Sequence, residues 1–147
     1  MLGTDVEARL ATVTGLALIA GAAGLAALRQ GDRLTVPPQT PAAFVIVLRE
    51  DPQADQRTTD LSALQRVIYH LAVITVVRVA NDRQGERTNA IMDQVRQGIR
   101  DALYGWVPPG FEAPLVRGPS ALFDFEGGAH WHQDEFITER YEVPISG

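Results

Sequence analysis

The chain of 147 residues is 46% hydrophobic and 21% charged, a balance typical of one globular domain and not of a disordered protein. Its formal net charge of −5 is spread along the chain, without the basic block that marks a nucleic-acid-binding surface. The absence of cysteine excludes disulfides, thiolate zinc sites and cysteine nucleophiles. We therefore expect a single domain over residues 1–147.

All thirteen basic residues are arginine. A GC-rich genome produces this bias without any functional reason. The planar guanidinium group also suits protein interfaces, so both explanations remain open.

An uncharged stretch from Leu10 to Leu28 is long enough for a membrane span or a signal peptide. Gly, Ala and Thr make up most of this stretch, so it is only weakly hydrophobic. The residues before it include Asp5 and Glu7 against Arg9, which is not the positive region that export needs. We expect no membrane segment here.

A helical segment is predicted over about residues 4–30. Thr4 is the expected N-cap, with Glu7 as its capping-box partner, and three apolar residues then share one helix face: Val6, Leu10 and Val13. Leu16–Ile19 is either a short strand or a continuation of the helix. Ala22–Arg29 is predicted to be a second short helix that stops near Gly31.

The domain core is predicted to span about residues 41–143, after prolines that break regular structure: Pro37, Pro38 and Pro41. Phe44–Leu48 is a continuous apolar run, as expected of a strand buried on both faces. Residues 49–60 are polar and are predicted to be a solvated loop with a functional role.

The clearest pattern in the chain is the β-branched, apolar run Arg66–Val79, which predicts the central strand. Both of its faces are mostly apolar, so one face is expected to lie on the core and the other against a helix or a neighbouring subunit. Fourteen residues would span roughly 45 Å at 3.3 Å each, longer than a domain this small is wide. We therefore expect the strand either to bend at a bulge or to project from the domain. His70 is interpreted as a core or interface residue and not as a catalytic base.

A polar turn over Asn81–Gly85 leads into a predicted helix, Arg87–Tyr104. Its apolar stripe has a spacing of four: Ile91, Val95, Ile99 and Leu103. The other face is predicted to carry Asp93, Arg96, Gln97, Arg100 and Asp101. Gly105 is expected to end the helix, and Pro108 prevents its continuation.

The C-terminal part predicts a β-hairpin. Pro114–Pro119 is expected to be irregular or a short edge strand, and Leu122–Glu126 a strand that turns at Gly127–Gly128. The return strand is predicted over His130–Val143, with these residues on one face: Trp131, Ile137, Tyr141 and Val143. Together the elements predict an α+β fold with a mixed or antiparallel sheet, a long central strand and two or three helices.

One cluster has the residue types of a metal site. His130, His132 and Asp134 alternate along the return strand, so their side chains share a face and have the chemistry to bind zinc. A solvated strand edge gives the same pattern, and it is the interpretation that we favour. The sequence lacks the nucleophile-elbow, P-loop, dinucleotide-binding and zincin motifs, so we expect no catalytic, metal or cofactor site.

The end of the helix and the hairpin resemble a known family. The residues concerned are Ala102-Leu103-Tyr104-Gly105-Trp106-Val107-Pro108, Pro114-Leu115, Phe123-Asp124-Phe125-Glu126-Gly127, Trp131 and Asp134-Glu135-Phe136-Ile137-Thr138. This pattern, within about residues 40–143, is similar to tail-terminator proteins of long-tailed phages, which also occur in Mu-like phages, prophages and gene transfer agents.

The resemblance implies an α+β fold, no cofactor and a homohexameric ring at the tail–neck junction of a virion, assembled in the bacterial cytoplasm. Such a ring ends the elongation of the tail tube, joins a head-completion or connector protein and lets DNA pass through its lumen. The alternatives are another neck component, such as a head-closure protein, a small metal-dependent enzyme that uses His130, His132 and Asp134, and a membrane-associated protein.

A ring subunit needs residues that reach its neighbours. From the projecting strand, the polar loop and the charged helix face, we predict that these residues contact a neighbouring subunit or the tail tube: Arg49, Asp51, Arg57, Arg66, Arg78, Arg96 and Arg100.

Overall fold

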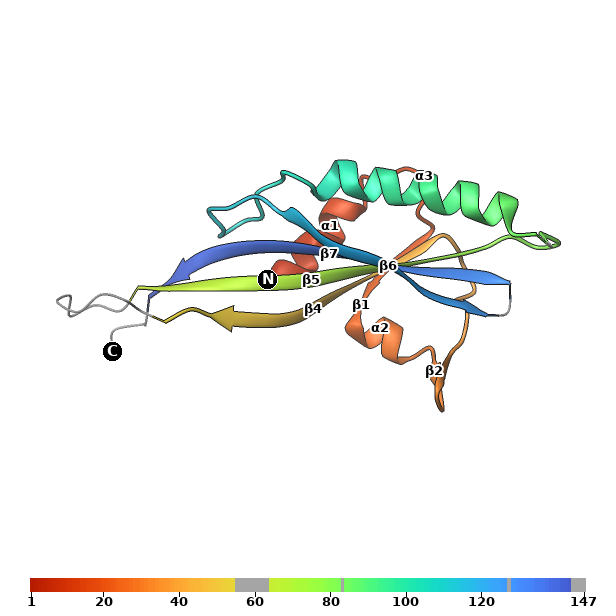
Figure 1. Cartoon of the computed structure of the whole chain (residues 1–147), viewed down its shortest axis with the longest axis horizontal. Coiled ribbons are helices and arrows are strands. Elements are labelled where there is room, and N and C mark those ends of the chain that lie inside the picture. The colour runs from red at the N-terminus through yellow and green to blue at the C-terminus, as the bar shows by residue number, and fades with distance from the viewer. Residues whose placement is uncertain (55–63, 83, 127, 144–147) are drawn as a thin grey trace.

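The structure, a computed structural model, describes residues 1–54, 64–82, 84–126 and 128–143. In chain order, the elements are α1 (Leu2–Leu10), β1 (Leu18–Gly21), α2 (Ala22–Ala26), β2 (Arg29–Gln30), β3 (Arg33–Leu34), β4 (Ala42–Pro52), β5 (Gln65–Arg78), α3 (Glu86–Leu103), β6 (Val116–Glu126) and β7 (Ala129–Glu142). Five strands form one sheet in the order β1-β4-β5-β7-β6, and β2 and β3 form a separate hairpin. Helices α1 and α3 lie on one side of the sheet and α2 on the other (Figure 1). Because β1 pairs parallel with β4 and the other neighbours pair antiparallel, the sheet is mixed, and the predicted α+β class is confirmed.

Strand β5 is the long central strand that the sequence predicts. It pairs with β7 in unbroken register from Gln65 to Arg78, while the neighbouring β4 has a bulge between Val47 and Arg49. In Figure 1 the end of the sheet where β4 finishes, β5 begins and β7 finishes extends past α1 and α3. The excess length of the strand therefore projects from the helical layer.

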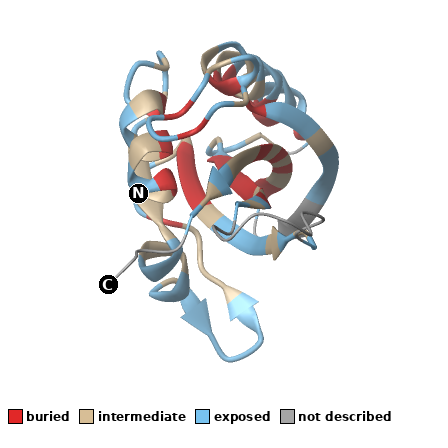
Figure 2. Ribbon diagram, turned by 90° about the vertical axis from the view of Figure 1, so that its left-hand side faces the viewer, coloured by how far each residue is buried: buried red, intermediate tan, exposed pale blue. Residues whose placement is uncertain are grey.

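The first face of the sheet, which α1 and α3 cover, carries the larger core. The side chains that this core buries are Val6 and Leu10 from α1, Val95, Ile99 and Leu103 from α3, and Val67, Tyr69, Leu71 and Val73 from β5. The buried residues in Figure 2 lie between these helices and the sheet. The predicted stripe on α3 is confirmed, although Ile91 is only partly buried where it packs on this core, and Met92, which was not predicted, is also buried.

The second face of the sheet is only partly covered. Helix α2 and the segment after it pack on a smaller core that contains Phe44, Ile74, Val76 and Trp131. The predicted helix Ala22–Arg29 is wrong in length, because the chain leaves α2 after Ala26 and enters β2 at Arg29. Of the two alternatives for Leu16–Ile19, the strand is correct, although it begins at Leu18 and ends at Gly21.

Two predicted boundaries need correction. Helix α1 begins at Leu2, so Thr4 lies inside it, and its hydroxyl donates to the carbonyl of Met1 (3.0 Å) instead of capping the helix. Strand β4 continues to Pro52 because Arg49–Pro52 pair with Val67–His70 of β5. Residues 49–52 are thus not a loop, and positions 55–60 of the predicted loop lie outside the described residues.

Strand β4 is also less buried than predicted. Strand β1 pairs with it only as far as Val45, so β4 forms the edge of the sheet beyond that point. Val47 and Leu48 are consequently 38% and 42% exposed.

The predicted C-terminal hairpin is confirmed, and β6 is the edge strand. It begins earlier than Leu122, and the Gly118–Pro119 pair falls at an irregularity between Arg117 and Ser120, where proline is tolerated in an edge strand. The predicted apolar face of β7 is not continuous, because the second core covers Trp131 but leaves Tyr141 50% exposed. Val143, after the end of β7, is 63% exposed.

The predicted helix stop at Gly105 is confirmed. Its φ of +85° is a left-handed conformation that glycine adopts without a steric penalty. Its amide donates to the carbonyl of Leu115 (2.8 Å), and the Leu115 amide donates back to Trp106 (2.9 Å). Among the described residues, the structure has no helix that is both long and apolar enough to cross a membrane.

Candidate functional site

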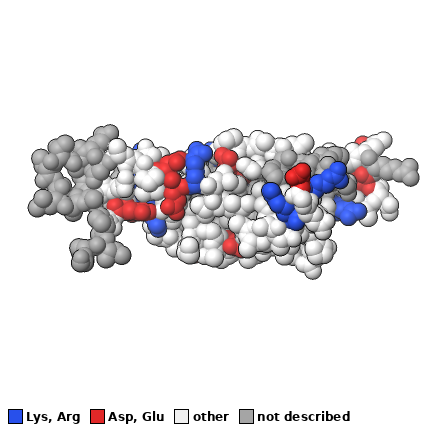
Figure 3. Space-filling model, turned by 90° about the horizontal axis from the view of Figure 1, so that it is seen from below, with Lys and Arg blue, Asp and Glu red and all other residues white. Residues whose placement is uncertain are grey.

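The part of the second face that α2 leaves uncovered is the most chemically varied surface of the sheet, and we call it the open sheet face. Strand register places these residues on it: Ile46, Arg49 and Asp51 of β4, Arg66, Ile68 and His70 of β5, and Gln133, Glu135, Ile137 and Glu139 of β7. Figure 3 views the molecule from this side and shows acidic and basic side chains next to one another. The open sheet face is thus an apolar strip with charged groups of both signs.

Arg49, Asp51 and His70 form a cluster on this face. Arg49 Nε donates to Asp51 Oδ2 (2.9 Å), and His70 Nε2 lies 3.1 Å from the same oxygen. Arg49 Nη2 also lies 3.4 Å from His70 Nε2. Because one ring nitrogen cannot donate to Asp51 and accept from Arg49 at once, the contact that forms depends on whether Nε2 of His70 carries a hydrogen.

A second ion pair joins β5 to β7. Arg66 Nη2 and Nε lie 2.5 and 2.6 Å from Glu139 Oε2. The hydrogen bond from the guanidinium to Glu139 and the charge of that carboxylate raise the pKa of Arg66. Both side chains are partly exposed, so water and salt screen the pair, and we assign it a role in orienting the surface and not in stability.

The first face carries a different cluster at the same end of the sheet. The guanidinium of Arg140 lies 5.1 Å from the ring centroid of Tyr69 and 4.9 Å from that of Phe111, and its Nε donates to Glu142 (3.0 Å). The Tyr69 hydroxyl also donates to Glu142. Burial, followed by the bond to Glu142, raises the pKa of Tyr69 to about 12. The hydrogen bonds from Tyr69 and Arg140 lower the pKa of Glu142.

A cavity of about 400 Å³ opens beside this cluster. Its lining includes Tyr69, Phe111, Arg140, Glu50 and the start of α1. The charged groups of the cluster already have partners within it. Because these contacts join β5, β7 and Phe111, the cluster holds the projecting end of the sheet together.

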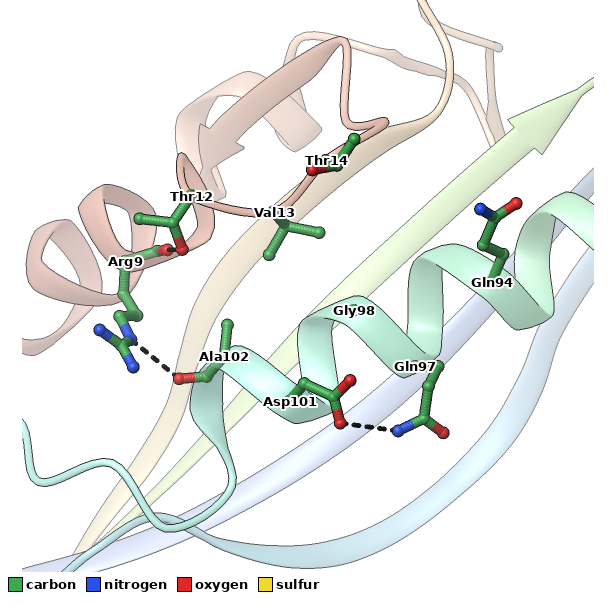
Figure 4. Close-up of a pocket in the computed structure, with 9 residues that line it drawn as sticks. All are labelled: Arg9, Thr12, Val13, Thr14, Gln94, Gln97, Gly98, Asp101 and Ala102. Carbon is green, nitrogen blue, oxygen red and sulfur yellow. Dashed lines mark hydrogen bonds between the residues drawn. The ribbon is translucent and has the colours of Figure 1, made fainter.

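A larger groove of about 640 Å³ lies between the end of α1 and α3 (Figure 4). Arg9 Nε donates across its end to the carbonyl of Ala102 (2.9 Å), and Gln97 donates to Asp101 (2.7 Å). The segment that follows α1 approaches α3 closely, since a Cβ added at Gly98 would lie 2.9 Å from Val13 Cγ1. The groove is open and polar, without a cluster of catalytic groups among its lining residues.

Of the three candidate metal ligands, Asp134 is held in an ion pair with α3. Arg96 binds Asp134 through two hydrogen bonds, Nε to Oδ2 (2.9 Å) and Nη2 to Oδ1 (2.8 Å). His132 Nδ1 lies 3.8 Å from Asp134, and burial lowers the pKa values of both His130 and His132. Within the described part of the chain, no group of three His, Asp or Glu residues has the arrangement of a metal site. Asp134 thus attaches α3 to the sheet, and His132 lies beside this ion pair.

The structure brings together three of the predicted interface residues, Arg49, Asp51 and Arg66, on the open sheet face. Arg78 lies outside the open sheet face, at the opposite end of β5, where its backbone contacts Thr40. On α3, Arg96 points to the sheet, whereas Arg100 contacts Gln97 on the outside. Arg57 lies outside the described residues. Their role in assembly stays a prediction.

Sequence reasoning missed Glu139, the partner of Arg66, and the cluster of Tyr69, Arg140 and Glu142 on the first face. Alternation along β5 and β7 places each of them on a face. The pairing of Arg66 with Glu139 depends on the register between strands that are 73 residues apart, and no local signal gives that register.

The comparisons with known proteins give one matching family and a solved structure of similar fold. The family model described as "Phage tail terminator protein" matches residues 3–143. Among solved structures, a chain of the "Virion of native gene transfer agent (GTA) particle" has a TM-score of 0.56 and 14% sequence identity, over 96% of this chain and 95% of that chain. At this identity the structural match shows a shared fold. No curated protein gave a significant match.

Proposed function

Because the chain belongs to the phage tail terminator protein family, and is thus a structural protein of a virion tail, we propose that it forms a ring that caps the tail tube. The ring ends elongation of the tube and presents a surface to which a head-completion or connector protein binds. The match over residues 3–143 carries this proposal, since it includes every helix and strand from α1 to β7 except the first residue of α1.

The structure supports a docking role in two ways. The sheet projects past its helices at one end, and its open face carries ion pairs with partly exposed partners (Figure 1). Rim charges of this kind contribute to partner choice and orientation more than to raw affinity. We also propose that the protein has a structural role and catalyses no reaction.

The proposed partners are further copies of the chain, in a ring of about six. The tail tube protein would bind one side of this ring and the head-completion or connector protein the other side. A ring needs one surface that contacts the next copy and a different surface that receives the previous one. The open sheet face and the outer face of α3 lie on opposite sides of the sheet, so they are distinct surfaces that such a ring can use.

Deletion of the gene in the bacterium that produces the particle tests the tail-capping role. We expect tubes of uncontrolled length and heads without attached tails, with both defects restored by the wild-type gene. Tails of normal length that fail only to join heads would instead indicate a head-closure or connector protein.

A further inference from the structure

A small hairpin arm projects from the second face of the sheet beside α2 (Figures 1 and 2). It comprises β2, a turn at Gly31–Asp32 and β3, and all five residues from Arg29 to Arg33 are exposed. Each of its strands has only two residues, and a two-stranded hairpin of this kind is at best marginally stable in water by itself. Its conformation therefore depends on what holds it.

The base of the arm is held firmly. The amide and the hydroxyl of Thr35 both donate to the carbonyl of Leu28, at 2.7 and 2.8 Å. Leu28, Leu34 and Val36 pack on the second core. The arm is thus held in one direction by partly buried neighbours, although its own tip contributes nothing to the core.

The arginine side chains of the arm are exposed and unpaired in the part of the chain that the structure describes. Neither Arg29 nor Arg33 has an ion-pair or hydrogen-bond partner among the residues that the structure describes, and Asp32 lies between them. An exposed arginine pair on a short, preorganised hairpin fits a surface that has acidic groups and an apolar strip.

The open sheet face has these properties. Its described carboxylates are Asp51, Glu135 and Glu139, against the two guanidinium groups of Arg49 and Arg66. Among the described residues, the Glu135 carboxylate accepts a hydrogen bond only from the side-chain amide of Gln133 (3.3 Å), so it is the carboxylate left over after the ion pairs form. The arm and the open sheet face therefore have complementary net charge.

We propose that the arm of one copy docks on the open sheet face of the next copy, with Arg29 and Arg33 directed at the Glu135 side of the apolar strip. The two surfaces occupy different places on the same chain, so the contact is head-to-tail and repeats around a closed ring. This inference rests on the proposed ring and specifies which surfaces join its subunits.

Cysteine cross-linking tests the contact, since the chain has no natural cysteine. The variant Asp32→Cys/Glu135→Cys carries one thiol on the arm and one on the open sheet face. On mild oxidation we expect a ladder of covalent oligomers up to the size of the ring. An equal mixture of the two single variants is expected to give heterodimers. The matched control Asp32→Cys/Asp93→Cys, with its second thiol exposed on α3 at the other face, is expected to give no ladder.

Charge reversal provides an independent measurement. Arg29→Glu/Arg33→Glu is expected to raise the protein concentration needed for half-maximal assembly at least about tenfold, and adding Glu135→Arg is expected to recover most of that loss. A native mass that shows a ring, together with no ladder and no effect of charge reversal, would overturn the arm contact but leave the ring. A wild-type protein that never assembles would overturn both.

Discussion

Arg96 of α3 and Asp134 of β7 form a two-point ion pair across the interface between the helix and the sheet. The two hydrogen bonds measure 2.9 and 2.8 Å, and the side chains are only 16% and 10% exposed. The bond to Asp134 raises the pKa of Arg96. This arginine, which the sequence places on the charged helix face opposite the apolar stripe, attaches α3 to the strand that pairs with β5.

Removal of one member of this pair leaves the other charge poorly solvated. We expect Arg96→Ala to lower the free energy of unfolding by about 3 kcal/mol, measured by urea denaturation. Arg100→Ala, one turn further along and outside the interface, is the control and is expected to change it by about 0.5 kcal/mol or less. Equal losses in the two variants would show that the pair contributes nothing specific.

Replacement of both members by apolar residues separates packing from charge. The double variant Arg96→Met/Asp134→Leu is expected to recover most of the stability lost in Arg96→Ala, because no charge is then left without a partner. Measured losses that simply add would contradict this coupling.

The raised pKa of Tyr69 predicts that the protein loses stability at alkaline pH. Its pKa is raised from 10.0 to about 12, so between these values the unfolded chain loses the phenolic proton while the folded chain retains it. The free energy of unfolding should therefore fall as pH rises from about 10 to 12. Chemical denaturation across this range should show a smaller fall in Tyr69→Phe, and equal slopes in the two proteins would refute the assignment.

The lowered pKa of Asp82 predicts that the protein loses stability at acid pH. Thr88 donates to Asp82 Oδ2 from both its amide and its hydroxyl, each at 2.7 Å, and these bonds lower the pKa of Asp82 below 3.8. Stability that this carboxylate contributes above pH 3.8 is lost as pH falls through its folded-state pKa. Acid titration of Asp82→Asn should lack this loss, and a loss equal to that of the wild type would contradict the role of Asp82.

At the groove between α1 and α3, Val13 leaves little room for a side chain at position 98. Alanine favours a helix interior over glycine by up to about 1 kcal/mol, but its Cβ would lie 2.9 Å from Val13 Cγ1. We therefore expect Gly98→Ala to bring no gain in the wild-type background and a clear gain in a Val13→Ala background. Denaturation of the four proteins in this double-mutant cycle provides the measurement, and an equal effect in both backgrounds would exclude the contact.

The elements that could be predicted are those whose periodicity is local. Strand β5 and helix α3 lie within one residue of their expected bounds, because β-branched runs and a spacing of four identify them directly. The end of β4 was missed because polar residues of an edge strand resemble a loop, and only pairing with β5 defines Arg49–Pro52 as a strand.

The candidate site was predicted only in part. Composition and strand length pointed to Arg49, Asp51 and Arg66 as surface residues, but their partners depend on the register of distant strands. The arm over Arg29–Arg33 was expected to lie at or beyond a helix end, since a pair of two-residue strands leaves almost no pattern in a sequence.

The native mass of the purified protein, with images of the particle, tests the central claim most directly. A ring of about six copies of this 16.0 kDa chain, 6 × 16.0 or about 96 kDa, with a central opening wide enough for DNA, is the result that we expect. A protein that remains monomeric at every concentration, and in the presence of tail tubes, would contradict the ring and the tail-capping function together.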